Sequence, residues 1–365
     1  MISIEASSIR EINEQSWDAI THQVLSMSHR WIRSVEASWR FYEPHYLLLE
    51  DQQGPSAVIV ANMYISPDKW MPIRWLYQRF SLVIKPPFSS MCSIVVRPGI
   101  ALETILPELE SALERLRQRE KRLLTIIANV TCSDVTVWQH VGFLADPQPA
   151  VSSIDLPDTY ETYLESLQRK DRQELRRIRK RAADFDVHFE IGPLKDDSEE
   201  IYSLLCEVYA KHGTTREDMP FTPQLFTSLE REMPGETLVI RGYACGRLAG
   251  VSINLLDHSM LLGLMVGLRY EIARPSFLYF LLQDEAIRWS IEHKLKRFYV
   301  GRTNEREKQK HGFKQEPRWL CYRANLQPLT QVLSLAVPLA QRFSQPVDNS
   351  KFHETSMDKK SNEVH

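Results

Sequence analysis

The stretch from Leu295 to Pro317 reads LKRFYVGRTNEREKQKHGFKQEP: a strand-forming run, a glycine, a short polar helix and a second glycine before another strand. The stretch from Leu123 to Phe143, LLTIIANVTCSDVTVWQHVGF, follows the same order. The two closing pairs, Gly142-Phe143 and Gly312-Phe313, are 170 residues apart. A fixed offset between similar segments indicates an internal repeat. The same offset separates the polar pairs before each short helix, Ser133-Asp134 and Thr303-Asn304.

The segments that precede each copy also correspond. Strand-forming runs come first, with a turn between the first two, and a long amphipathic helix follows. We expect strands at 46–51, 57–63 and 93–96 with a helix at 102–118 in the first half, and strands at 237–242, 248–256 and 260–268 with a helix at 277–293 in the second. The sequence therefore predicts an α/β (α+β) fold of two tandem units, each a mixed, mainly antiparallel sheet flanked by helices.

Changes in composition divide the chain into three parts. Two prolines and a serine pair interrupt the pattern at 145–153, which predicts a boundary between a first unit, 1–148, and a second unit, 149–327. Both are close to the usual size of a domain. Residues 328–365 are expected to form an apolar helical appendage and a disordered tail, because the last part is polar and has no periodicity.

The composition is that of a globular protein, with 43% hydrophobic and 25% charged residues and a net charge of −2. Such a balance does not favour a nucleic-acid binder, although it can conceal a local basic patch. The five cysteines form no CxxC pair and predict reduced, mostly buried thiols. The first residues do not resemble a secretory signal, and no apolar run approaches the length of a membrane span. We expect a cytoplasmic protein without a membrane span.

Three further segments have distinctive patterns. Trp31, Val35 and Trp39 share one face of a helix predicted over 29–39, which is typical of a core position. The proline-punctuated, aromatic segment 67–87 predicts an irregular lid or insertion, whose rings either line a pocket or pack beneath a loop. The helix predicted over 169–183 carries eight basic and two acidic residues between 169 and 181. This basic face is either solvated or attracts a phosphate-rich ligand.

The repeated unit resembles the fold of the GNAT acyltransferases, which have the same order of hairpin, strand, long helix, buried strand and short helix closed by Gly-Phe. The string Asn304-Glu305-Arg306 before Gly312-Phe313 is similar to the closing segment of that family, but about one turn shorter and without its tyrosine. The resemblance covers roughly Trp17 to Asn325 and rests mainly on element order. It implies an N-acyltransferase that takes acyl-CoA (acetyl-CoA) as donor and a small-molecule amine as acceptor.

Two such units in tandem, with a basic helix opening the second, resemble the Fem-type aminoacyltransferases and a related GNAT-like group of cellulose and peptidoglycan-type biosynthesis. In that group a strand ending in glycine precedes a lysine and another glycine, which here are Gly301, Lys308 and Gly312. The Fem resemblance implies a different donor, aminoacyl-tRNA, and makes tRNA a possible partner. The chain has no room for the long helical hairpin arm of the Fem proteins. We expect the second unit to be catalytic, because more polar residues follow its buried strand, and the first not to be.

The expected donor site departs from the GNAT pattern. GNAT proteins that bind acetyl-CoA have a Q/R-x-x-G-x-G/A loop whose backbone amides hold the pyrophosphate at a helix amino terminus. No glycine lies between Arg269 and Ser276, so the two arginines and the start of the next helix, capped by Ser276, would bind the coenzyme instead. Separation of the fourth and fifth strands would expose backbone amides, and two glycines, Gly263 and Gly267, would let the ligand approach. The expected donor-binding residues are Val266, Gly267, Leu268, Arg269, Arg274, Ser276 and Asn304.

Acyl transfer to an amine requires a proton acceptor for the amine and donors that polarise the carbonyl. Each candidate has a structural alternative: residues of the short helix may only form its exposed face, His212 may bond the last helical carbonyls, and Asn304 may only cap a helix. No Cys/His cluster has metal-binding spacing, so no metal is predicted. The candidate catalytic residues are Glu305, Lys308, His212 and Tyr270. A catalytically silent protein that presents its basic helix to RNA or to a partner is the remaining alternative to the two transferases.

Overall fold

The computed structural model describes residues 2–64, 80–91, 93–195, 197–302 and 304–325. The described residues of the first half contain six strands and four α-helices. They are β1 (Ile2–Ala6), α1 (Glu14–Thr21), α2 (His29–Glu36), β2 (Tyr42–Asp51), β3 (Gly54–Tyr64), β4 (Ser81–Ile84), β5 (Ile94–Val96), α4 (Leu102–Arg119), β6 (Leu124–Val130) and α5 (Val135–His140).

The second half repeats this order with two additional helices at its start. Its elements are β7 (Leu144–Asp155), α6 (Tyr160–Ser166), α7 (Arg169–Ala182), β8 (His188–Gly192), α8 (Ser198–Ala210), α9 (Gln224–Glu232), β9 (Thr237–Ala244), β10 (Arg247–Asp257), β11 (Met260–Leu268), α10 (Tyr270–Ala273), α11 (Leu278–Glu292), β12 (Arg297–Val300), α12 (Glu305–Lys310) and β13 (Lys314–Ala324).

The predicted repeat is confirmed at the level of single residues. The helices α5 and α12 begin and end 170 residues apart, and so do the starts of β7 and β13. Gly142 and Gly312 end these helices with φ angles of 85° and 82°. Only glycine adopts this left-handed conformation without steric cost, which explains why both copies have it here.

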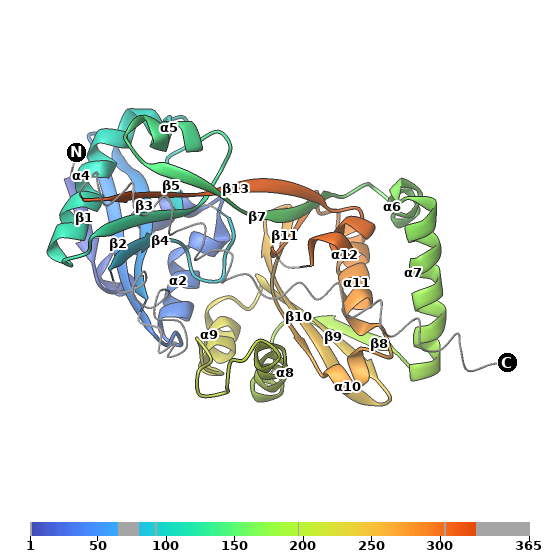
Figure 1. Ribbon diagram of the computed structural model, residues 1–365. Coiled ribbons are helices and arrows are strands. Elements are labelled where there is room, and N and C mark those ends of the chain that lie inside the picture. Colours follow the sequence, from blue (N-terminus) through green and yellow to red (C-terminus); the bar gives the residue numbers. More distant parts are fainter. Residues whose placement is uncertain (1, 65–79, 92, 196, 303, 326–365) are drawn as a thin grey trace.

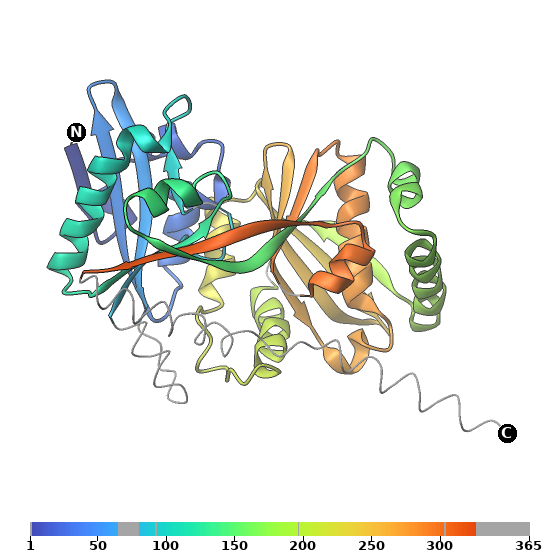
Figure 2. The same cartoon turned by 45° about the horizontal axis from the view of Figure 1, so that its top comes forward.

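The described strands form one 13-stranded sheet in the order β1-β2-β3-β4-β6-β13-β7-β12-β11-β10-β9-β8, with β5 paired to β3. Each half of the sheet is mixed and mainly antiparallel and is flanked by helices, as predicted (Figure 1). The two halves exchange their last strands. The strand β13 pairs with β6 of the first half, β7 pairs with β12 of the second, and β7 and β13 pair with each other. Figure 2 shows β13 extending from the second lobe across the first.

The expected interruption at 145–153 is therefore wrong, because these residues belong to the continuous strand β7. Its prolines are tolerated because β7 pairs with β12 only from Ser152 onward. Pro147 and Pro149 precede that point, so their missing N–H groups cost no bond to β12. The division into units at 148 stays a prediction.

The expected irregular segment 67–87 also contains a regular element. Its four-residue run β4 pairs antiparallel with β3 and parallel with β6. Residues 67–79 of that segment lie outside the described residues, and so do the expected appendage and tail, 328–365.

The helices divide the core into layers. The helices α4 and α5 cover one face of the first half, while α6, α7 and α11 cover the second half. A shared core joins α1 and α2 of the first half to α8 and α9 of the second, and it contains Trp31 and Val35, both fully buried as predicted. Arg30 of α2 donates to Glu236 at 2.6 Å and strengthens this contact.

Two other expectations concern cysteines and membranes. Cys132 and Cys245 are exposed, Cys206 is partly buried and Cys321 is buried, so the prediction of mostly buried thiols is wrong. None of the helices in the described ranges is both long enough and apolar enough to cross a membrane.

Candidate functional site

The fourth and fifth strands of the second unit separate, as predicted. The strand β11 pairs with β12 only through Met260–Leu262, whereas its pairing with β10 continues to Leu268. The edge of β11 beyond Leu262 therefore faces no strand on the β12 side. Val266, Gly267 and Leu268 lie on this edge, where backbone groups can bind a ligand.

The glycines of this strand have a different purpose from the one expected. A Cβ atom on Gly267 would lie 2.9 Å from the Leu204 side chain, and one on Gly263 would lie 3.3 Å from the Tyr299 carbonyl oxygen. Both glycines are thus needed for close packing within the protein, against α8 and β12. Their role in ligand approach is not supported.

The loop after β11 forms a helical turn that uses its own amides. The amides of Ile272 and Ala273 donate to the Arg269 carbonyl, and that of Arg274 donates to the Tyr270 carbonyl. The Ser276 hydroxyl is fully buried and donates to the Ile272 carbonyl at 2.7 Å. Ser276 is therefore not the predicted cap, a position taken by the next residue without any side-chain bond. These amides do not form a GNAT-type phosphate cradle.

Side chains gather around the Tyr270 ring instead. The Lys211 ammonium lies 4.8 Å and the Arg274 guanidinium 5.3 Å from the centroid of this ring. Burial and the Arg274 charge lower the pKa of Lys211, and burial and the Lys211 charge lower the pKa of His212. Arg269 lies nearby on the same loop, with its Nε 3.7 Å from a Glu207 carboxylate oxygen. The structure thus brings the predicted Tyr270 and Arg274 together, and the predicted His212 follows Lys211, whose charge acts on it.

Lys211 was missed by sequence reasoning. It follows the last residue of α8 and occupies the capping position, where a lysine is commonplace because it complements the helix dipole. Only the approach of α10 to the end of α8 shows that this lysine belongs to the cluster. We call Lys211, Arg269, Tyr270 and Arg274 the basic cluster.

Tyr279 connects the basic cluster to the turn after β12. Its pKa is raised by burial and, to a smaller extent, by the neighbouring Tyr270. The Asn304 amide donates to the Tyr279 hydroxyl at 3.3 Å. Asn304 occupies the N-cap position before α12, as the structural alternative supposed, with a φ angle of 58°, but its side chain makes no capping bond.

Lys308 is buried, which is inconsistent with the structural alternative that it belongs to an exposed helix face. The residue is only 4% exposed, and its ammonium group donates a hydrogen bond to the Gly301 carbonyl. Burial lowers its pKa to about 8, against the opposing charge of Glu305. Glu305 is half-buried in the first turn of α12 and makes no ion pair within the described residues. Lys308 therefore holds the Gly301–Asn304 turn in place.

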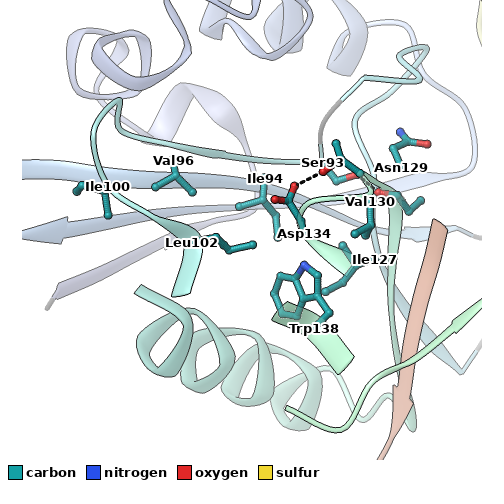
Figure 3. A pocket seen from close by; sticks show the side chains of 12 residues that line it. Ser93, Ile94, Val96, Ile100, Leu102, Ile127, Asn129, Val130, Asp134 and Trp138 are labelled. Atoms are coloured by element: carbon teal, nitrogen blue, oxygen red, sulfur yellow. Dashed lines mark hydrogen bonds between the residues drawn. The ribbon is translucent and has the colours of Figure 1, made fainter. Parts of the chain in front are cut away.

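A cavity with a volume of about 270 Å³ lies in the first unit. Figure 3 shows Ile94 and Val96 of β5 on one side and Trp138 of α5 on the other. Asp134 also lines it and accepts a hydrogen bond of 2.7 Å from the Thr131 hydroxyl. A second cavity of about 120 Å³ lies between α7, α11 and α12 and includes His311. The unit expected to lack catalysis thus also contains a cavity.

Comparisons with known proteins identify the family. The model of the FemAB-like family, described as peptidoglycan biosynthesis/recognition, matches residues 155–345. No curated protein matches the chain. The described residues contain no cluster of His, Cys, Asp and Glu that is suited to a metal ion.

Solved structures show the same fold at low sequence identity. FemX has a TM-score of 0.59 and 11% identity over 91% of this chain and 99% of its own. The C-terminal domain of a putative lysylphosphatidylglycerol synthetase from Agrobacterium fabrum has a TM-score of 0.56 and 14% identity over 89% and 96%. A tandem GNAT protein of the clavulanic acid pathway has a TM-score of 0.53 and 10% identity over 88% and 98%. Because the family model spans more than half of the sequence and the fold is a tandem GNAT fold, the chain belongs to the FemAB-like family and is a transferase.

Proposed function

We propose that the second unit transfers an acyl group from a phosphate-bearing donor, acyl-CoA, to the amino group of a small-molecule acceptor. The observation that carries this proposal is the basic cluster beside the point where β11 and β12 separate. Lys211 and Arg274 lie against one ring, and neither makes an ion pair within the described residues. Two unpaired like charges repel each other, and a phosphate would relieve this repulsion.

The donor's phosphates would then bind side chains instead of backbone amides. Val266, Gly267 and Leu268 lie on the free edge of β11 and would face the acyl carbonyl, as donors do in acyl-transfer enzymes. Asn304 lies between this edge and the acceptor side through its bond to Tyr279. Ser276 has its hydroxyl occupied and is left without a direct role.

The proton transfers can be assigned to groups with suitable pKa values. The amine loses a proton as its nitrogen forms the amide bond, and the donor sulfur gains one as its bond to the acyl carbon breaks. The lowered pKa of His212 keeps this imidazole neutral at pH 7, so it can accept the proton, with Glu305 as the alternative acceptor. The raised pKa of Tyr270 keeps its hydroxyl protonated, so it can donate to the leaving group. Lys308 positions the turn between them.

The test measures donor binding to a Lys211→Gln, Arg274→Gln double variant by calorimetry. We expect acetyl-CoA affinity to fall at least about tenfold, since each charged hydrogen bond contributes about 1.5–3 kcal/mol. Arg247→Gln, an exposed arginine on the neighbouring hairpin, is the matched control and should bind normally. Equal affinity in the double variant and the wild type would remove the basic cluster from the donor site.

Aminoacyl-tRNA is the second candidate donor, favoured by the family and by the exposed face of α7. Arg176, Lys180 and Arg181 are exposed there and make no ion pair within the described residues. A polyanion bound to this face would dissociate steeply with rising salt. Charge removal at Arg176 and Lys180 should then weaken charged tRNA without affecting acetyl-CoA. If charged tRNA does not bind, or binds equally well after these two substitutions, the tRNA candidate fails.

A further inference from the structure

The carboxyl ends of the two equivalent strands β6 and β12 approach each other across the exchanged strands. The order β6-β13-β7-β12 places β13 and β7 between them. Arg302 follows β12 and donates through its guanidinium to the side-chain amide oxygen (Oδ1) of Asn129, near the end of β6. One side chain of the second unit therefore reaches over the exchanged strands to the first.

Asn129 is held firmly in the conformation that receives Arg302. Its backbone has a φ angle of 62°, in the left-handed region that asparagine tolerates better than most residues. Its backbone amide donates to the Gln148 side chain at 3.0 Å, and its side-chain amide donates to the Ser89 carbonyl at 3.3 Å. With the residue only 2% exposed, its side-chain oxygen is directed to Arg302 by contacts from two other segments.

The charge of Arg302 is not compensated. Burial lowers its pKa to about 10, and the only other charge that acts on it is the like charge of Arg318 on β13. Arg318 is 9% exposed and bonds Glu316 at 3.1 Å. That carboxylate is shared with Arg297, which bonds it at 2.6 Å. The Nε atoms of Arg302 and Arg318 are both buried without a hydrogen-bond partner.

A neutral side-chain oxygen does not balance a buried guanidinium. Buried charges are ordinarily paired, since the loss of hydration is otherwise not offset. Here Glu316 is the carboxylate partner of Arg318 and is shared with Arg297, which also pairs with Asp155 at 3.3 Å, while Arg302 forms no ion pair within the described residues. The Nε–H groups of Arg302 and Arg318 point to no acceptor. A planar anion with two oxygens matches the fork of a guanidinium.

We propose that the crossing of β7 and β13 binds an anionic ligand group, a carboxylate or a phosphate, with Arg302 as its main contact and Arg318 as the second. The site is distinct from the basic cluster and does not depend on which donor is used. A substrate that carries such a group would be held between the two units, beside the turn that Lys308 fixes. Both units would then contribute to its recognition through Arg302 and Asn129.

The experiment follows thermal stability in the presence of inorganic phosphate, acetate or chloride at equal ionic strength. It uses the Lys211→Gln, Arg274→Gln double variant as background, so that phosphate bound to the basic cluster does not contribute. A ligand that binds only the folded state raises the melting temperature with its concentration. We expect phosphate, acetate or both to raise the melting temperature more than chloride does. The anion with the larger effect is the preferred one.

Arg302→Gln should remove this stabilisation, with an apparent affinity at least about tenfold lower. In chloride it should be as stable as its background or more so, because the amide of glutamine can still donate to Asn129 and the uncompensated charge is gone. Arg288→Gln, a remote arginine on α11 with a loose 3.9 Å ion pair, is the control and should respond as the background does. The proposal would be overturned if the anions raised the melting temperature equally in Arg302→Gln and Arg288→Gln, or if neither anion raised that of the background.

Discussion

Lys308 and Trp138 occupy equivalent places in the two units, 170 residues apart, and both are buried. The first unit fills this space with an indole that packs against Phe143 at a ring distance of 5.2 Å. The second unit places an ammonium there and directs it to the Gly301 carbonyl. A lysine in a position that suits an apolar side chain reduces stability, so it is kept for the turn that it fixes.

Lys308→Met is expected to raise the free energy of unfolding at pH 7 and to lower turnover at least about tenfold, or about 1.4 kcal/mol. The gain arises because a side chain of similar length no longer brings a charge into the interior. The loss arises because the Gly301 carbonyl and the turn to Asn304 are no longer held. Urea denaturation and steady-state rates measure the two effects, and a variant that is less stable but fully active would contradict both.

The pH dependence of stability follows from the same lysine. Its pKa is about 8 in the folded protein and about 10.4 in an unfolded chain. Between these values the unfolded chain binds a proton that the folded protein has lost, so the free energy of unfolding rises with pH, by up to about 3 kcal/mol. Denaturation series from pH 7 to about pH 10.4 should show this rise in the wild type. The same series on Lys308→Met should lack it.

At the scale of elements, the basic helix α7 is held by one buried carboxylate. Asp284 of α11 accepts hydrogen bonds from Arg179 of α7 at 2.9 Å and from Tyr160 of α6 at 2.5 Å. Asp284 is 2% exposed. Part of the basic pattern in this helix therefore serves packing, while its other arginines and lysines stay at the surface.

Asp284→Asn should destabilise the protein by about 3 kcal/mol or more, because it leaves Arg179 without its counter-ion in a mostly buried place. Glu174→Gln is the matched control on the same helix, since its pair with Arg177 spans one turn at the surface. Its cost should stay below about 0.5 kcal/mol. Chemical denaturation compares the free energies of unfolding of the two variants. Similar losses would show that the Asp284 network stabilises the protein no more than a surface ion pair does.

Element identity could be predicted wherever local pattern decides it. The strand β11 and the helices α4, α7 and α11 begin and end within a few residues of their predicted limits, because periodicity and turn residues specify them. The strands β4 and β7 were missed, since one is four residues long beside prolines and the other contains prolines itself. Both are strands only because neighbouring strands supply partners, and that information is not local.

At the scale of the molecule, the exchange of β7 and β13 makes the two halves one cooperative body. The strand β6 pairs with β4 of its own half on one side and with β13 on the other, and β12 pairs with β11 of its own half on one side and with β7 on the other. Calorimetry should therefore show a single unfolding transition, and a chain of residues 1–155 alone should lack fixed tertiary structure. Two separate transitions, or a folded fragment, would show that the halves are independent.

The repeat could be predicted from the sequence, but the exchange could not. Either last strand, β7 or β13, could pair with either fifth strand, β6 or β12. The local sequence therefore does not determine which pairs form. For the same reason, only part of the candidate site could be predicted from the sequence. Tyr270 and Arg274 do meet, whereas the reach of Arg302 to Asn129 depends on how the exchanged strands set the two units against each other.

The exchange also has a consequence for synthesis on the ribosome. The edge of β6 waits for a strand that ends almost 200 residues later in the chain. At about 5–20 residues per second this strand is translated roughly 10–40 s after β6. During that interval the nascent first half exposes the unpaired edge of β6, a strand whose residues are all buried in the folded protein. Such an edge is a template for pairing with other chains. Slow translation or crowding of nascent chains should therefore favour aggregation of this protein, and a chaperone that covers the β6 edge should suppress it.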